Sequence, residues 1–310
     1  MTDKEYLVAL YAFTGFGPIR IRLLLNYFKS AKRVWELELD EILKVGLHKN
    51  IAEKFTIHRN NFDFTKYFQR LEKLGIKYTT NADREYPKNL RDLEDAPVVI
   101  YYMGVLSNKD ESAVAIVGSR KMTPYGKEIA EKFSRELGKH GITIVSGLAR
   151  GVDTVVHRGA LSVGGRTIAV IASGLDRIYP PENTKLVYEI IRMGGAVMSE
   201  YPLGYPPLPS NFPLRNRIVS GISKAILVVE GLERSGTLIT ASHAAEQGRS
   251  VFAVPGRITS PTSGAPHFLL QNGAKLALSP KDILDELSLE IKVDNDEETS
   301  LENINKHSKS

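Results

Sequence analysis

Val114-Ala115-Ile116-Val117-Gly118-Ser119-Arg120 is the stretch of the chain that decides its fold. The first four residues form an uninterrupted apolar run, which is typical of a parallel strand buried on both faces. The run ends in glycine, serine and arginine, so a small-residue turn and a cation follow the strand directly. Open α/β sheets bind ligands beyond the carboxyl ends of their strands, and this turn is therefore expected at a binding edge.

Two further stretches repeat this arrangement. Ile142-Thr143-Ile144-Val145 leads into Ser146-Gly147-Leu148-Ala149-Arg150, and Ala225-Ile226-Leu227-Val228-Val229 leads shortly afterwards into Ser235-Gly236-Thr237. Backbone amides at a helix start, with an arginine beside them, suit a phosphate group. One such turn is equally well explained by a helix cap with a solvent-facing arginine. Three turns on one sheet edge favour an anion-binding site.

Strands and helices alternate from residue 112 to about residue 287. We expect strands at 113–117, 142–146, 167–172, 195–199, 225–230 and 250–254, preceded by one at 98–102. Helices are expected near 125–139, 153–163, 183–193, 214–222 and 237–247. The alternation predicts the α/β class, with a doubly wound parallel sheet and right-handed crossovers.

The first 75 residues are expected to be helical. Gly15-Phe16-Gly17-Pro18 provides a tight turn followed by a helix start, the layout of a helix-hairpin-helix. Its amides can contact a phosphate backbone, or the segment can be a small bundle that only packs or dimerises. The predicted organisation is a helical domain over 1–75, an α/β domain over 76–287 and an acidic, disordered tail over 288–310.

Composition limits the classes of protein that the chain can belong to. The 310 residues contain no cysteine, which excludes disulfides, a thiolate nucleophile and zinc sites that need cysteine ligands. No apolar run approaches the ~18 residues of a membrane span, and the first residues do not resemble a signal peptide, so a cytoplasmic protein is expected. The net charge is +5, and because the tail carries six acids against three lysines, residues 1–287 carry +8. A basic body suits a polyanionic partner.

Several familiar site motifs are missing from the sequence. There is no Gly-x-Gly-x-x-Gly, no Gly-x-x-x-x-Gly-Lys-Ser/Thr, no His-Glu-x-x-His and no Gly-x-Ser-x-Gly. These absences argue against dinucleotide or ATP binding of the usual kinds, a zinc hydrolase and a serine hydrolase. We expect no cofactor and no metal.

Asn211-Phe212-Pro213-Leu214-Arg215-Asn216-Arg217 is a further signal. Pro213 is expected to fix a helix start, which would place Arg215 and Arg217 near the first turn. Cations there oppose the helix dipole, so they call for a bound anion or a buried acid such as Glu200. Phe212 can stack on a nucleobase or pack into the core, and the sequence leaves both open.

Asp153 and His157 are four residues apart on an expected helix and so share one side of it. They can act as an acid and a base, or as a capping aspartate beside a hydrogen-bonded histidine. Asn183 is expected to cap the following helix.

In combination, these motifs resemble the DNA-processing protein A family, called DprA or Smf. The resemblance rests on the stretches above, on Gly174-Leu175-Asp176-Arg177-Ile178-Tyr179-Pro180, on His157-Arg158-Gly159 and on Phe252-Ala253-Val254-Pro255-Gly256. It implies an extended Rossmann-like domain behind a small helix-hairpin-helix or SAM-like domain, homodimerisation and binding of single-stranded DNA. It also implies loading of a RecA-type recombinase in natural transformation and recombination, without enzymatic activity.

By this resemblance and the turn chemistry, one set of residues is expected to bind DNA phosphates or line the DNA pocket: Gly118, Ser119, Arg120, Ser146, Gly147, Arg150, Arg158, Arg177, Phe212, Arg215, Asn216, Arg217, Ser235, Gly236 and Thr237. The alternative is a nucleotide-processing enzyme related to nucleoside monophosphate phosphoribohydrolases, which carry Pro-Gly-Gly-x-Gly-Thr-x-x-Glu. Thr240 stands here in place of that glutamate. A hydroxyl cannot replace a carboxylate as general base at neutral pH, which favours binding over turnover.

Overall fold

The computed structural model describes residues 1–288 and begins with a group of short helices. Thr2 and Glu5 form a reciprocal capping box at the start of the first helix, and Pro18 opens the second one directly after Gly17. This is the hairpin of helices expected from the sequence. The helices are α1 (Asp3–Ala12), α2 (Pro18–Phe28), α3 (Ala31–Trp35), α4 (Leu39–Lys44), α5 (Lys49–Asn61) and α6 (Phe64–Lys73).

A nine-stranded sheet follows, in the order β1-β2-β6-β5-β4-β3-β7-β8-β9. β2 pairs antiparallel with both β1 and β6, and every other pair is parallel. The strands are β1 (Lys77–Thr80), β2 (Val99–Gly104), β3 (Val114–Val117), β4 (Ile144–Ser146), β5 (Thr167–Val170), β6 (Ala196–Ser199), β7 (Ala225–Val228), β8 (Ser250–Ala253) and β9 (Lys275–Leu276). The chain builds outward from β3 through β4 and β5 to β6, then crosses back to β7, so the sheet is doubly wound as predicted.

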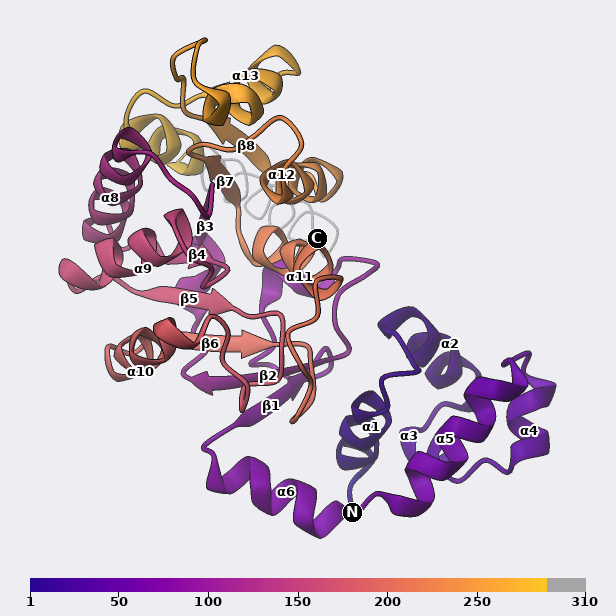
Figure 1. Cartoon of the computed structure of the whole chain (residues 1–310). Coiled ribbons are helices and arrows are strands. Elements are labelled where there is room, and N and C mark those ends of the chain that lie inside the picture. The colour runs from indigo at the N-terminus through magenta and orange to yellow at the C-terminus, as the bar shows by residue number, and fades with distance from the viewer. Residues whose placement is uncertain (289–310) are drawn as a thin grey trace, which may run out of the picture.

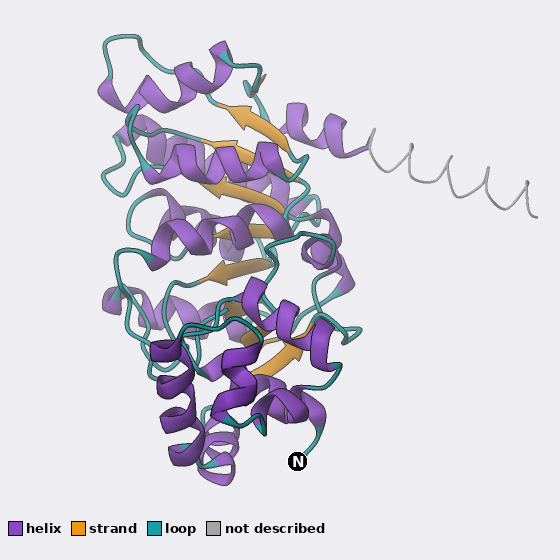
Figure 2. Ribbon diagram, turned by 90° about the vertical axis from the view of Figure 1, so that its right-hand side faces the viewer, coloured by secondary structure: helices purple, strands orange, loops and turns teal. Residues whose placement is uncertain are grey.

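Helices cover both faces of this sheet (Figure 2). α8 and α9 pack together on one face, and α11 and α12 on the other. The helices are α7 (Lys88–Arg91), α8 (Pro124–Lys139), α9 (Val152–Ser162), α10 (Thr184–Arg192), α11 (Asn211–Ile222), α12 (Gly236–Glu246) and α13 (Gly264–Gln271). Another helix begins at residue 280 and reaches residue 288. The connection from β3 therefore runs to one face and that from β7 to the other, although the two strands are neighbours.

The N-terminal helices pack against the β1–β2 end of the sheet (Figure 1). One continuous apolar cluster contains Phe13, Trp35 and Phe55 from these helices together with Tyr101 of β2 and Val197 of β6. The predicted division at residue 75 coincides with the change from helices to strands, but the core crosses it. It stays a prediction that the two parts are separate domains.

The predicted strands and helices are present, with two differences of note. α11 begins at Asn211, before Pro213, so Arg215 lies in the second turn of the helix. β1, β9 and α13 were not predicted. The tail expected to be disordered lies outside the described residues, apart from Ser288.

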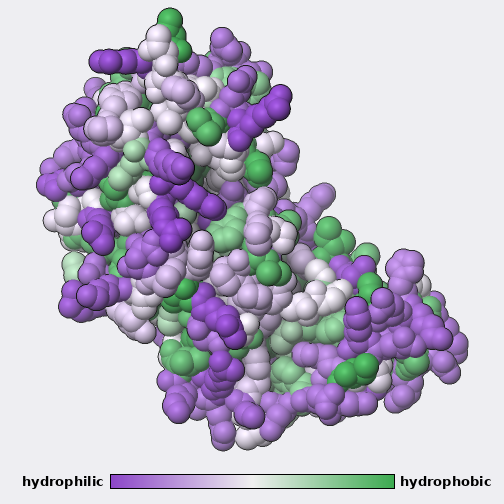
Figure 3. Space-filling model, in the orientation of Figure 1, coloured by the Kyte–Doolittle hydropathy of each residue, from purple (hydrophilic) through white to green (hydrophobic). Residues whose placement is uncertain are grey.

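The outer surface is largely hydrophilic on the face shown in Figure 3, where apolar side chains form small separate patches. Within residues 1–288, no helix has both the length and the apolar content required to cross a membrane.

Candidate functional site

The β3–β7 boundary is the topological switch point of the sheet, where the two connections leave for opposite faces. A hollow of about 730 Å³ opens there, beyond the carboxyl ends of the strands. All three predicted turns contribute to its lining. From the predicted set, the hollow is lined by Gly118, Ser119, Arg120, Gly147, Phe212, Arg215, Asn216, Ser235, Gly236 and Thr237.

The turn after β3 packs closely against Val152 and Glu230. A Cβ on Gly118 would lie 2.7 Å from Cγ2 of Val152 and 3.1 Å from the carbonyl oxygen of Glu230, so only glycine fits. The Ser119 hydroxyl accepts a hydrogen bond from the amide of Lys121 at 3.0 Å, which holds the turn in shape. Arg120 projects from it as an exposed cation. Within residues 1–288, no carboxylate lies within ion-pair distance of Arg120.

The turn after β4 is fixed by buried side chains. The Asp153 carboxylate accepts hydrogen bonds from the amides of Gly147 and Ala149, at 3.1 and 3.2 Å. Asn183 donates from Nδ2 to the Leu148 carbonyl at 2.8 Å. These bonds hold Leu148 at a φ of +58°, a left-handed conformation that a leucine adopts only when its surroundings impose it. The turn is therefore preorganised.

Arg215 lies beneath this turn. Its guanidinium donates from Nη1 to the carbonyl oxygens of Gly147 and Val170, which ties the turn after β4 to the end of β5. Burial lowers the pKa of Arg215 to about 10, so the side chain remains charged at neutral pH. The structure thus makes Arg215 a buried positive charge in the wall of the hollow, with its terminal Nη1 already bonded to protein.

The turn after β7 presents the N-terminus of α12. Ser235 occupies the N-cap position, and its buried hydroxyl has no hydrogen-bond partner among the described residues. The free amides at the start of a helix and the helix dipole favour an anion at this point. Asn216 donates to the carbonyl of Gly236 at 3.2 Å, which connects α11 to the same turn.

Four predicted residues lie elsewhere. The Ser146 hydroxyl is buried and donates to the carbonyl of Ile116, because β4 directs it into the sheet. Arg158 faces a separate groove between α8 and α9, and the exposed Arg177 lines neither hollow nor groove. Arg217 points away from the hollow because residues two apart on a helix face different directions.

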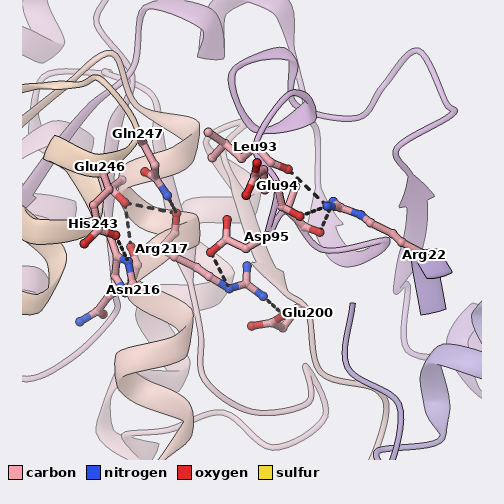
Figure 4. Close-up of polar contacts among 12 residues, drawn as sticks. Arg22, Leu93, Glu94, Asp95, Glu200, Asn216, Arg217, His243, Glu246 and Gln247 are labelled. Carbon is pink, nitrogen blue, oxygen red and sulfur yellow. Dashed lines mark hydrogen bonds and ion pairs between the residues drawn. The ribbon is translucent and has the colours of Figure 1, made fainter. Parts of the chain in front are cut away.

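Arg217 instead has the buried acid partner that the sequence suggested. Figure 4 shows its side chain extending from α11 toward Glu200 and Asp95. Nη2 donates to the Glu200 carboxylate, and Nε lies 3.6 Å from Oδ2 of Asp95. The hydroxyl of Tyr11 in α1 lies 3.4 Å from the same Glu200 oxygen, so the pair also contacts the N-terminal helices.

Arg150 belongs to the rim of the site. It lines a small pocket that adjoins the hollow and also contains Arg120, Phe212 and Tyr179. Tyr179 was not predicted. A tyrosine and a proline in the loop that follows the expected strand at 167–172, on the same edge as the other turns, were the signal that could have identified it.

Asp153 and His157 are buried at the base of the hollow. The hydrogen-bonded histidine matches the structural alternative, but Asp153 does not cap its helix: Gly151 is the N-cap of α9, and the carboxylate bonds to the amides of Gly147 and Ala149. His157 is fully buried, and its Nδ1 lies 2.7 Å from the hydroxyl of Thr167. Burial lowers the pKa of His157 to about 3, so it is neutral at physiological pH. Asn183 holds the N-cap position of α10, but its side chain bonds to Leu148 and Thr154 rather than to that helix. Within residues 1–288, no group of three acidic or histidine side chains is placed to hold a metal ion.

Comparison with known proteins places this chain in a family. The family model described as DNA recombination-mediator protein A matches residues 77–288. Protein Smf from Synechocystis sp. is 39% identical over 293 residues, which cover 91% of this chain and 72% of that protein.

Two solved structures are similar in fold and sequence. DNA processing protein A (DprA) from Streptococcus pneumoniae has a TM-score of 0.78 and 37% identity, over 92% of this chain and 98% of that one. DNA processing protein A from Helicobacter pylori, described for its single-stranded DNA binding mode, has a TM-score of 0.61 and 31% identity, over 69% of this chain and 97% of that one.

Proposed function

The chain belongs to the DNA recombination-mediator protein A family, and from this membership we propose that it binds single-stranded DNA in the hollow at the β3–β7 switch point. The observation that carries the proposal is the meeting of three preorganised turns around Arg120, an exposed cation with no acidic partner among the described residues. A DNA strand with a phosphate at this point contacts the Arg120 guanidinium and the N-terminus of α12 at the same time.

The chemistry of the lining supports a single strand over a duplex. Phe212 lies beside Arg120, and an aromatic ring next to a phosphate-binding cation suits an unpaired base above its own phosphate. Binding of this kind is sensitive to salt and largely independent of sequence.

The finer role that we propose is transfer of the bound strand to a RecA-type recombinase in the cytoplasm, by a homodimer, during recombination or uptake of DNA. Support comes from the family description as a recombination mediator. A test is the rate of RecA filament assembly on strands coated with a single-strand binding protein, with and without this protein. An unchanged rate would remove this part of the proposal and leave DNA binding intact.

We propose that the site binds DNA without cleaving or hydrolysing it. Thr240 occupies the position of the hydrolytic glutamate of the phosphoribohydrolases, and its hydroxyl donates to the Gly236 carbonyl at 3.1 Å. Asp153 is the acidic residue among the described residues that line the hollow, and its carboxylate is already bonded to two amides. Release of free base from nucleoside monophosphates by the purified protein would contradict this.

The binding site is tested by Arg120→Ala with an oligothymidine in a fluorescence-anisotropy titration. Loss of one phosphate contact is expected to lower affinity and to reduce the slope of log affinity against log salt by about 0.7. Arg135→Ala is the matched control, because Arg135 is a partly exposed arginine on α8 that pairs with Glu131 and does not line the hollow. If Arg120→Ala binds the oligothymidine with wild-type affinity, the assignment of the DNA-binding site to this hollow is refuted.

A further inference from the structure

Four side chains lie side by side along the rim of the hollow, in the order cation, ring, ring and cation. The Arg120 guanidinium lies 5.0 Å from the centre of the Phe212 ring, and the Arg150 guanidinium lies 5.8 Å from the centre of the Tyr179 ring. The two ring centres are 5.8 Å apart, with their planes at 68°. We call Arg120, Phe212, Tyr179 and Arg150 the rim row.

The members of the rim row come from separate parts of the sequence. Arg120 and Arg150 follow β3 and β4, Tyr179 ends the loop after β5, and Phe212 lies in the first turn of α11. Local chain geometry therefore does not account for their arrangement. The fold brings four independent segments to one edge, and each contributes one element of the row.

Tyr179 is 37% exposed, although its ring borders the hollow. Its neighbours in the adjoining small pocket include Pro180, Pro207 and Phe212, which form an apolar wall. A ring that is half free beside such a wall offers a face on which a flat ligand can stack. A base gains from this contact whatever its sequence.

Arg150 is held in place while its charge stays at the surface. Its Nε donates to the Glu182 carboxylate, and its side chain is 53% exposed. The groove beyond it, of about 630 Å³, is lined by Lys127 and Arg158 but also by the acids Glu131 and Glu182. That mixed charge gives the groove no clear preference for an anion, so the rim row ends at Arg150.

We propose that the rim row is a two-nucleotide site, in which Tyr179 stacks on the base next to the one on Phe212 and Arg150 binds the phosphate next to the one on Arg120. The inference rests on the proposed function, because it places a second nucleotide of the same bound DNA strand in the site. The row consists of two cation–ring pairs, Arg120 with Phe212 and Arg150 with Tyr179, and each pair offers one phosphate contact and one base contact, as one nucleotide requires. The rings are not parallel, so the two bases are held apart rather than stacked on each other.

The test compares oligothymidines in which one position at a time is abasic. With the wild-type protein, removal of the base that stacks on Tyr179 is expected to weaken binding roughly 5- to 100-fold. Tyr179→Ala is expected to weaken binding of the intact strand by a similar factor and to become insensitive to that abasic position. Tyr179→Phe keeps the ring and is expected to bind as the wild type does.

Tyr188→Ala serves as the matched control, because Tyr188 is a 66% exposed tyrosine on α10 that does not line the hollow. Arg150→Gln is expected to reduce the salt slope by about 0.7, in the same way as loss of any one phosphate contact. The inference is overturned if Tyr179→Ala binds the intact strand with wild-type affinity. It is also overturned if every abasic position weakens binding of Tyr179→Ala as much as it weakens binding of the wild type. If the inference is overturned but Arg120→Ala still weakens DNA binding, the proposed function holds without the two-nucleotide site. If the wild-type protein does not bind, both fall.

Discussion

The guanidinium of Arg217 and the carboxylate of Glu200 pair in the interior, where both side chains are only 8% exposed. Arg217 comes from the helix that also carries Phe212 and Arg215, and Glu200 follows β6. The pair therefore joins α11 to the strand edge and, through Tyr11, to the N-terminal helices. Its role is to hold the binding helix in position.

Glu200→Gln is expected to destabilise the protein by up to about 3–5 kcal/mol, because it removes the buried ionic partner of Arg217 and leaves only the longer contact to the partly exposed Asp95. Unfolding in urea measures this. Glu41→Gln, which removes the partner of Arg33 in a pair whose Glu41 and Arg33 side chains are 36% and 49% exposed, is the control and should cost much less, because solvent screens the pair. Equal losses for the two variants would show that Glu200 contributes no more than a surface acid.

Gly151→Ala should both destabilise the protein and weaken DNA binding. Gly151 has a φ of +77°, and a Cβ there would collide with the Ser119 carbonyl and lie 2.8 Å from Cα of Arg120. Gly141 has nearly the same φ, +78°, with nothing within 4 Å of a Cβ. Gly141→Ala thus measures backbone strain alone, about 1–2 kcal/mol, without an effect on DNA binding. Urea unfolding and anisotropy titration of both variants measure the additional loss at Gly151, which combines the collision with the turn and the ψ of −130° at this residue. If the two behave alike, the turn does not depend on Gly151.

His157 makes the stability depend on pH in a defined direction. Its folded pKa of about 3 lies below the usual value near 6.5, so the unfolded chain binds the proton more readily between these values. The contribution of neutral His157 is complete above about pH 6.5 and falls as the pH is lowered toward 3. Between pH 7 and pH 5 the wild type should lose about 2 kcal/mol through this residue.

His157→Gln should remove that share of the pH dependence in urea unfolding, since glutamine does not titrate. His48→Gln, at an exposed position, is the control and should retain the wild-type dependence. The same pH dependence in wild type and His157→Gln would show that the histidine is not buried in neutral form.

Arg22 connects the N-terminal helices to the α/β body. Its guanidinium donates to the carbonyls of Leu93, Glu94 and Ala96, as Figure 4 shows in part. Arg22→Ala should raise hydrogen exchange of the amides at 92–96, because hydrogen bonds to a charged donor contribute about 1.5–3 kcal/mol. Arg20→Ala, which removes a bond only to Gly15 in the same hairpin, should leave those amides unchanged. Unchanged exchange in Arg22→Ala would contradict the connection.

Much of the α/β body could be predicted because its strands are continuous apolar runs and its helices start at recognisable turns. Val114–Val117 is buried along its whole length, as its composition implies. β1 and β9 are short edge strands without an apolar run: the two buried residues of β1 are threonines, and both residues of β9 are exposed, so they lack this signal. α11 was expected to start after Pro213, but its first turn accommodates the proline, which needs no amide bond there.

The sequence predicts that the site lies at the carboxyl edge of the sheet. It predicts less well which individual side chains line the site. A sequence shows that Arg215 and Arg217 are two apart, but not which of them faces the hollow or which is bonded beneath it. Burial of Arg215 under Gly147 and the pairing of Arg217 with Glu200 depend on contacts between distant segments. The same holds for Tyr179, whose place beside Phe212 arises only when β5 and α11 come together.

Hydrogen exchange of the wild-type protein with and without an oligothymidine tests the central claim most directly. The account predicts protection of the amides at 118–121, 147–150 and 235–237, while amides on the outer surface of α4 and α5 remain unchanged. Protection confined to the hairpin at residues 15–17, or no protection at the three turns under conditions where the strand is bound, would contradict it.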